Sequence, residues 1–195
     1  MEKTAIILVN YKAYAKRFLN DCLKSIRRQN WHGEIKIFIV DNKTSKESFD
    51  YLKSMAPEAN IICNKNNDGF AKGNNDAIRI AIKKGYDYIA LFNLDVVIDK
   101  NCLNEMIKAI KKDNKIGAVQ ARLMLYQKKE KINSLGNKIH FLGFGYCDAY
   151  QESMSNYKLP VINYKDICYP SGAGVLFKRN VLEKVGLYDE KFWMY

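Results

Sequence analysis

The feature that most constrains the fold of this chain is the alternation of strand-like and helix-like segments over its first 120 residues. Short runs rich in β-branched and aromatic residues occupy 4–9, 35–40, 60–63, 88–92 and 116–122. Segments whose apolar residues recur about every 3.6 positions lie between them, at 14–28, 45–55, 71–84 and 101–112. Alternating strands and helices predict an α/β fold, with a mostly parallel, Rossmann-like sheet and helices on both faces.

The regular alternation ends near residue 123. From there to residue 166 the chain is polar and contains Gly136, Gly143 and Gly145, a pattern typical of irregular loops and short antiparallel strands. A strand is expected again at 173–177, followed by a helix at 179–185. We therefore expect one domain over residues 1–195, with a nucleotide-binding half at 1–122 and a smaller antiparallel cap at 123–195 that shapes a second pocket.

The charge balance is strongly basic, with 32 Lys and Arg against 21 Asp and Glu and a net charge of +11. Such an excess favours nucleic acid, anionic lipid headgroups or a phosphate-bearing substrate, but lysines scattered along the chain also occur on solvated helix faces. The most basic run, 128–131, is too short for the basic stripe with interleaved aromatics that nucleic-acid binding needs. We expect no nucleic-acid partner, and we keep peripheral association with a membrane open.

The five cysteines contain no C-x-x-C pair, so the sequence indicates neither a disulfide framework nor a zinc site. A reducing, cytoplasmic location fits this pattern, and no run approaches the ~18 apolar residues of a membrane span. The chain ends in the aromatic run 192–195, whereas real termini are usually polar. Either these residues dock into the core, or the sequence is a segment of a longer protein, and we expect the second.

Polar residues directly follow four of the predicted strands. They are Asn10 and Tyr11, Asp41 and Asn42, the segment 64–67, and Asn93 with Asp95. In an open parallel sheet, ligands bind outside the carboxyl ends of the strands. We therefore expect these four groups to converge on one edge of the sheet and to form the binding site there.

Two of these groups have alternative interpretations. Asp41 is placed either to accept a hydrogen bond from a nucleoside or to cap the turn before the next helix. In the segment 66–75, Gly69 permits positive φ or a close backbone approach, and the helix start beside Lys72 offers N–H groups to an anion. An ordinary helix start with an Asn or Asp cap explains the same residues equally well.

Asp95 emerges beside an apolar strand, in the sequence Asn93-Leu94-Asp95. Mg²⁺ and Mn²⁺ prefer oxygen ligands and often take only one or two protein carboxylates, with phosphates and water as the remaining ligands. The sequence therefore predicts that Asp95 binds a divalent cation together with a diphosphate.

Taken together, these segments resemble the family 2 glycosyltransferases, especially their rhamnosyltransferase-like branch. The resemblance covers essentially the whole chain and rests on the order and spacing of 6–11, 40–42, 66–75, 93–95 and 171–174. It implies a GT-A fold that transfers a sugar, with inversion, from a nucleoside-diphosphate sugar to a hydroxyl of a glycan or lipid-linked acceptor. It also implies Mn²⁺ or Mg²⁺ as cofactor.

The resemblance implies a role for each candidate residue. Asp41 would hold the base, and Asn10 and Tyr11 would contact the nucleoside. The nucleotide pocket would be lined by Asn67, Gly69, Phe70, Lys72 and Asn74. Asp95 would be the metal-holding aspartate of the family's D-x-D, in which Asn93 takes the first position here. The acceptor side would be bordered by Gly172, Ala173 and Gly174.

The resemblance places the general base beyond Tyr195, so Asp189 and Glu190 are not assigned this role. Two other functions stay open for this reason. One is a non-catalytic nucleotide-sugar-binding module or fragment. The other is a different nucleotide-using transferase, although the segment 10–14 lacks the glycines that a nucleotidyltransferase loop would need. Residues 1–195 are expected to bind the donor and to transfer the sugar slowly or not at all.

Overall fold

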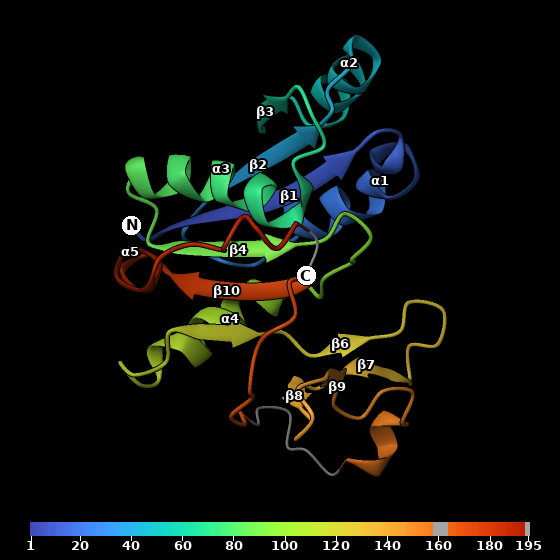
Figure 1. Cartoon of the computed structure of the whole chain (residues 1–195), viewed down its shortest axis with the longest axis vertical. Helices are drawn as coiled ribbons and strands as arrows, with labels where there is room; N and C mark the ends of the chain where they lie inside the picture. The colour runs from blue at the N-terminus through green and yellow to red at the C-terminus, as the bar shows by residue number, and fades with distance from the viewer. Residues whose placement is uncertain (158–163, 194–195) are drawn as a thin grey trace.

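A six-stranded sheet forms the centre of the structure, a computed structural model that describes residues 1–157 and 164–193 (Figure 1). Its strand order is β3-β2-β1-β4-β10-β5. Parallel neighbours are β1 (Lys3–Tyr11), β2 (Glu34–Asn42), β3 (Asn60–Asn64) and β4 (Tyr88–Phe92). β10 (Gly174–Lys178) lies antiparallel between β4 and β5 (Ala118–Gln120). The predicted α/β fold with a mostly parallel sheet is confirmed.

Helices cover both faces of this sheet, as the sequence predicts. One face packs against α1 (Tyr14–Arg27), α2 (Lys46–Met55) and α4 (Cys102–Lys111), and the other against α3 (Gly69–Lys83) and α5 (Arg179–Val185). Successive side chains of a strand point to opposite faces. In β1, Ile6 and Leu8 therefore join the core under α1, while Ala5 and Ile7 join the core under α3.

The helix starts differ in how they are capped. Ser45 is the N-cap of α2, as predicted, and forms a reciprocal capping box with Ser48. The helix predicted at 71–84 begins two residues earlier, at Gly69, whose φ of 77° only glycine adopts without strain. This early start brings the first turn of α3 to the edge of the sheet.

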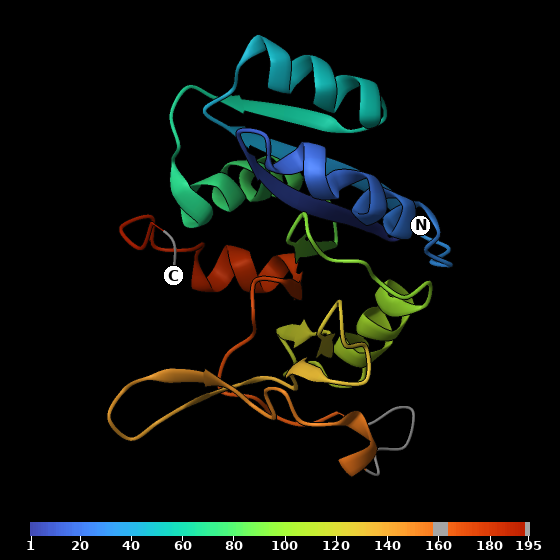
Figure 2. The same ribbon diagram turned by 90° about the vertical axis from the view of Figure 1, so that its right-hand side faces the viewer.

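Two small antiparallel sheets lie to one side of the main sheet (Figure 2). They consist of β6 (Leu123–Met124) with β7 (Ile132–Ser134), and β8 (Asn137–Ile139) with β9 (Gly145–Cys147); the short helix η1 (Met154–Asn156) follows. The short antiparallel strands expected after residue 123 are thus present. β10 and α5, which we expected in the cap, return to the main sheet and its covering layer.

Two of the expectations fall outside the described residues. Met194 and Tyr195, which end the aromatic run, are not described, and the general base was expected beyond Tyr195. Within 1–157 and 164–193, no helix combines the length and apolar character needed to cross a bilayer.

Candidate functional site

Hydrogen bonds and strand pairing bring the four predicted polar groups to one edge of the sheet. Asn10 of β1 lies opposite Asp41 of β2, and Asn42 lies opposite Asn64 of β3. Asp95, which follows β4, accepts a hydrogen bond from the Tyr14 hydroxyl at the start of α1. The predicted convergence of the strand ends is therefore present in the structure.

Asp41 is fully buried, and both of its carboxylate oxygens are engaged. Oδ1 accepts a hydrogen bond from Asn10 Nδ2 at 2.7 Å, and Oδ2 accepts one from the Ser48 hydroxyl at 2.6 Å. Ser45 is the N-cap of α2, but Asp41 does stabilise the turn before this helix, as its alternative interpretation predicted: its backbone oxygen accepts a hydrogen bond from the Thr44 hydroxyl at 2.7 Å, and its Oδ2 binds Ser48. Each carboxylate oxygen has a second lone pair, but the Asp41 side chain has no exposed surface in this structure.

Asn10 links β1 to the start of α1. Its Nδ2 also donates to the backbone oxygen of Lys12, and its Oδ1 accepts from the backbone N–H of Ala15 at 2.9 Å. The turn between them contains Lys12 at φ 52°, a left-handed conformation. Tyr11 is 38% exposed at this turn, so its ring is accessible at the edge where Asn10 and Asp41 meet.

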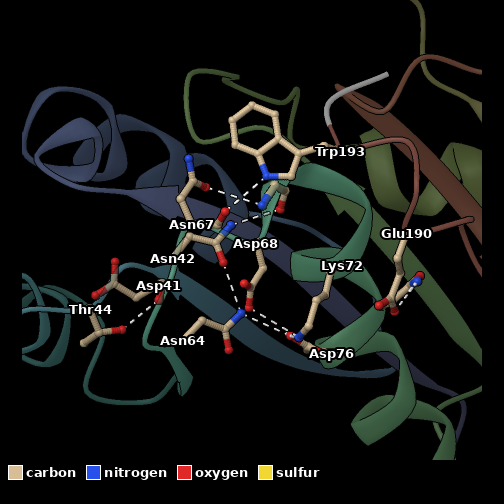
Figure 3. A network of polar contacts seen from close by, with 12 residues as sticks. Asp41, Asn42, Thr44, Asn64, Asn67, Asp68, Lys72, Asp76, Glu190 and Trp193 are labelled. Carbon is tan, nitrogen blue, oxygen red and sulfur yellow. Dashed lines mark hydrogen bonds and ion pairs between the residues drawn. The ribbon is translucent and has the colours of Figure 1, made fainter.

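The start of α3 contacts the C-terminal segment 188–193 (Figure 3). The Phe70 N–H donates to the Trp193 backbone oxygen at 2.7 Å, and Trp193 Nε1 donates to the Asn67 backbone oxygen at 3.1 Å. A Cβ atom at Gly69 would lie 2.2 Å from the Trp193 oxygen. Gly69 thus meets both requirements foreseen for it, positive φ and close backbone approach, and the Phe70 N–H is already paired.

Lys72 is held between two carboxylates of its own helix region. Its Nζ lies 2.9 Å from Asp76 and 3.4 Å from Asp68. The hydrogen bond to Asp76 is the main cause that raises the pKa of the Lys72 ammonium above its usual value. Lys72 therefore stays charged, but Asp68 and Asp76 compensate the charge that we expected it to offer to an anion.

Asn42 and Asn64 extend this network across β2 and β3. Asn42 Nδ2 donates to the Gly69 backbone oxygen at 3.0 Å, while Asn64 Nδ2 donates to Asn42 Oδ1 and to Asp76 Oδ2. These contacts join the second and third strand ends to the first turns of α3 (Figure 3). Residues 67–70, which we call the Gly69 loop, are therefore held by Asn42 of the sheet on one side and by Trp193 on the other.

Two neighbouring asparagines of α3 have different partners. Asn74, a predicted pocket residue, is buried and donates to the Phe70 backbone oxygen at 2.9 Å within its own helix. Asn75 is fully buried and reaches the C-terminal segment, where it donates to the Tyr188 backbone oxygen and to Glu190 Oε1 and accepts from the Tyr188 N–H. Sequence reasoning included Asn75 in the segment expected to line the nucleotide pocket but did not foresee these contacts, because the partners lie 113 and 115 positions away.

Glu190 is engaged by two donors. Besides Asn75, Arg79 Nη2 contacts Glu190 Oε1 at 2.6 Å. The hydrogen bonds from Asn75 and Arg79 lower the pKa of the Glu190 carboxyl below its usual value. The neighbouring Asp189 accepts from the Lys191 N–H at 3.0 Å. The carboxylates of Asp189 and Glu190 thus both accept hydrogen bonds from other residues of the chain.

Asp95 differs from the buried Asn10 and Asp41 because it is exposed. Tyr14 donates to its Oδ2 at 2.9 Å, and burial together with this hydrogen bond raises the pKa of the Tyr14 hydroxyl. Asp95 lines a pocket of about 780 Å³ with α1 residues such as Arg17 and the segment 125–128. Its Oδ1 has no hydrogen-bond partner within the described residues.

Asp95 suits a metal ion whose other ligands are a diphosphate and water. Within 1–157 and 164–193, no three Asp, Glu, His or Cys residues cluster closely enough to enclose an ion. An exposed carboxylate can supply one or two oxygens to Mg²⁺ or Mn²⁺ when diphosphate and water supply the others. The donor chemistry around Asp95 therefore fits a metal–diphosphate and would not fit a closed protein cage.

The predicted acceptor-side segment packs against the Gly69 loop. A Cβ atom at Gly172 would lie 2.5 Å from the Phe70 ring, so only glycine allows this approach. The Ala173 N–H donates to the Ser171 hydroxyl oxygen, and Gly174 already pairs with Phe92 in the main sheet. Gly172 thus lies beside Phe70, one of the predicted pocket residues, whereas Gly174 lies in the main sheet.

Comparisons with known proteins agree with this geometry. The family model for Glycosyl transferase family 2 matches residues 5–186. The dTDP-rhamnosyl transferase RfbF of Shigella flexneri is 26% identical over 198 residues, which cover 96% of this chain and 58% of that protein. The chain therefore spans less than two thirds of the length of this curated relative.

Solved structures share the fold at low sequence identity. The mannosyltransferase PcManGT from Pyrobaculum calidifontis, in complex with GDP-Man and Mn²⁺, has a TM-score of 0.65 and 16% identity over 96% of this chain and 47% of its own. TarS 1–349 from S. aureus, in complex with UDP, has a TM-score of 0.61 and 15% identity over 99% of this chain and 52% of its own. The fold is that of the GT-A glycosyltransferases.

Proposed function

The chain belongs to glycosyl transferase family 2, and from this premise we propose that it transfers a sugar from a nucleoside-diphosphate sugar to a hydroxyl of a glycan or lipid-linked acceptor, with inversion. The observation that carries this proposal is the placement of the exposed Asp95 on the same sheet edge as the buried pair Asn10 and Asp41. A donor needs both a fixed site for its nucleoside and an accessible carboxylate near its diphosphate.

The buried pair serves the nucleoside end of the donor. Asp41 receives the base or ribose through its remaining lone pairs once a side chain that covers it moves aside, since it has no exposed surface here. The exposed ring of Tyr11 contacts the nucleoside face. Asn10 holds Asp41 and the turn before α1 in fixed positions. Because these groups are oriented before binding, little conformational freedom is lost when the nucleoside binds.

The first turns of α3 form the adjoining wall of the nucleotide pocket. Asn67, Gly69 and Phe70 supply its surface, while Lys72 and Asn74 stabilise its backbone. Lys72 does not contact a phosphate in this proposal, since its charge is compensated by Asp68 and Asp76. The segment Gly172 to Gly174 borders the pocket on the acceptor side.

Asp95 serves the diphosphate end. When bound there, Mn²⁺ or Mg²⁺ neutralises the negative charge that develops on the leaving diphosphate. Tyr14 donates to one oxygen of Asp95 and so orients the other toward the ligand. The PcManGT complex, which contains GDP-Man and Mn²⁺, supports this assignment by analogy of fold.

The acceptor hydroxyl needs a carboxylate that removes its proton as it attacks the anomeric carbon from the face opposite the diphosphate. Neither Asp189 nor Glu190 is assigned this role, because the resemblance matches them to an Asp-Glu pair that precedes the base; Glu190 is in addition engaged by Asn75 and Arg79. We place the base after residue 195, as the resemblance implies. We also place the protein in a reducing, cytoplasmic compartment, since all five cysteines are free thiols.

A thermal-shift panel tests the donor site. Nucleoside diphosphates and nucleotide sugars with dTDP, GDP and UDP should raise the unfolding temperature, and Mn²⁺ should increase the shift, because ligands that bind the native state stabilise it. Asp95→Ala should remove the Mn²⁺-dependent part of the shift, while Asp50→Ala, on the exposed surface of α2, should retain it. A metal-dependent shift that survives Asp95→Ala would contradict the assignment.

A further inference from the structure

The hairpin formed by β8 and β9 exposes an unusual concentration of large apolar side chains. We call residues 139–146 the hairpin tip; its exposed residues include Ile139, Phe141, Leu142, Phe144 and Tyr146. Phe141 is 87% exposed, the largest value among the aromatic residues of the described chain. In Figure 2 this ribbon, orange in colour, extends away from the main body.

The hairpin tip is an ordered turn. The His140 N–H donates to the Phe144 oxygen and the Gly143 N–H donates to the His140 oxygen, both at 2.8 Å. Gly143 has φ 89°, and a Cβ atom there would meet nothing within 4 Å. The His140 ring lies 4.3 Å from that of Phe141 and 5.8 Å from that of Phe144, between ring centroids.

Pairing of these backbone groups lowers the cost of moving the turn into an apolar medium. An unpaired N–H or C=O group in hydrocarbon costs several kcal/mol, which usually keeps loops out of membranes. At the hairpin tip two N–H groups and two oxygens are paired within the turn, and the Leu142 N–H donates to His140 Nδ1 at 3.3 Å. These three hydrogen bonds reduce the number of backbone groups that would enter an apolar medium unpaired.

Two lysines lie at the base of the hairpin. Lys138 and Lys165 both pair with the carboxylate of Asp148, and Asp166 adds a second negative charge next to Lys165. The positive charge that would attract an anionic surface is therefore the net charge of the whole chain, +11. Exposed apolar and aromatic side chains on a protein of positive net charge favour binding to the surface of an anionic bilayer.

We propose that the hairpin tip inserts into the interfacial layer of an anionic lipid bilayer and attaches the protein to the membrane surface. A projecting turn fits a deformable lipid surface, which needs no complementary groove. Phe141, Leu142 and Phe144 enter the acyl boundary, while Lys138 stays at the headgroups. This attachment goes beyond the proposed transferase function and does not depend on it, because it requires neither nucleotide nor acceptor.

Sedimentation with vesicles tests the attachment. The 195-residue chain should co-sediment with vesicles of phosphatidylcholine and phosphatidylserine, and more weakly with phosphatidylcholine alone or at high salt. Phe141→Ser combined with Phe144→Ser should lower the partition coefficient by about tenfold or more, since each loses a buried aromatic group. Val185→Ser, which changes an exposed apolar residue on α5, should leave partitioning unchanged.

A fluorescent variant gives a readout at the hairpin tip itself. Phe141→Trp should show a blue-shifted emission component on addition of anionic vesicles, beyond any change of the parent protein, which contains Trp31 and Trp193. Urea unfolding of each variant shows whether its fold is retained. No sedimentation of the parent protein, or equal partitioning of the double variant, would overturn the proposal. So would a hairpin-dependent dimer in light scattering without vesicle binding, which would identify a second copy as the occupant.

Discussion

The two flanks of the candidate site use their polar groups in opposite ways. On the sealed flank, which comprises Asn10, Asp41, Asn42, Asn64 and the Gly69 loop, side chains are buried or half-buried and bonded to one another or to Trp193. On the open flank, Asp95 is exposed beside a pocket and has one protein partner, Tyr14, within the described residues. The difference indicates a preformed binding wall on one side and an exchangeable ligand position on the other.

Gly69→Ala should destabilise the protein more than any other substitution at the site, because it disrupts the tightest contact of the sealed flank. The new Cβ atom would be strained by the left-handed backbone and would clash with the Trp193 oxygen. The free energy of unfolding measured by urea titration should therefore fall by about 3 kcal/mol. Gly85→Ala is the matched control, since Gly85 has φ 73° but open space around it, and should cost only about 1 kcal/mol. Equal losses would mean that the Trp193 contact does not constrain this loop.

Asp41→Asn tests the buried pair of the same flank. The variant keeps the shape but turns an amide toward the donors Asn10 or Ser48, so we expect a loss of about 2 kcal/mol in unfolding free energy. Nucleoside diphosphate binding should weaken by about 1.5–3 kcal/mol in calorimetry, as for a hydrogen bond to a charged group. Asp50→Asn on the exposed face of α2 should change neither quantity; unchanged affinity in Asp41→Asn would remove Asp41 from the nucleoside site.

Glu190 offers a smaller, pH-dependent test of how the C-terminal segment is attached to α3. Its folded pKa is lowered by Asn75 and Arg79, so its contribution exists above the unfolded pKa of about 4.3 and is lost as pH falls through the folded value. Because its side chain is 34% exposed, the contribution should stay below about 1 kcal/mol. Unfolding free energies measured between pH 6 and pH 3 should fall less steeply for Glu190→Gln than for the parent protein. An identical slope would show that this ion pair contributes nothing.

Asp95→Ala should have the smallest effect on stability. Its carboxylate is exposed and bonded to one tyrosine, so the unfolding free energy should change by less than about 0.5 kcal/mol. The same variant loses the Mn²⁺-dependent response to nucleotides, and this separation of binding from stability is what distinguishes the open flank. A loss near that of Asp41→Asn would make Asp95 part of the structural network instead.

The sequence predicted the strands of the main sheet, the helices and the sheet edge at which the candidate residues meet, because these follow from local periodicity and from the rule for parallel sheets. It did not predict the partners of Asn75 or the pairing of the Phe70 N–H with Trp193, since these contacts join residues more than 110 positions apart. The compensation of the Lys72 charge, by contrast, could have been predicted from the sequence. Asp68 and Asp76 stand four residues on either side, a spacing that indicates ion pairs on a helix.

The position of β10 in the sheet has a consequence for the order in which the chain folds. Among the described residues, β5 is hydrogen-bonded to the main sheet only through β10, whose residues pair with β4 more than 80 positions earlier in the chain. As the polypeptide leaves the ribosome, strands β1 to β4 can pair first, while β5 has no neighbour until residues 174–178 emerge. Closure of such a distant pair is slow, so the nascent chain passes through a stage in which β4 is an open edge.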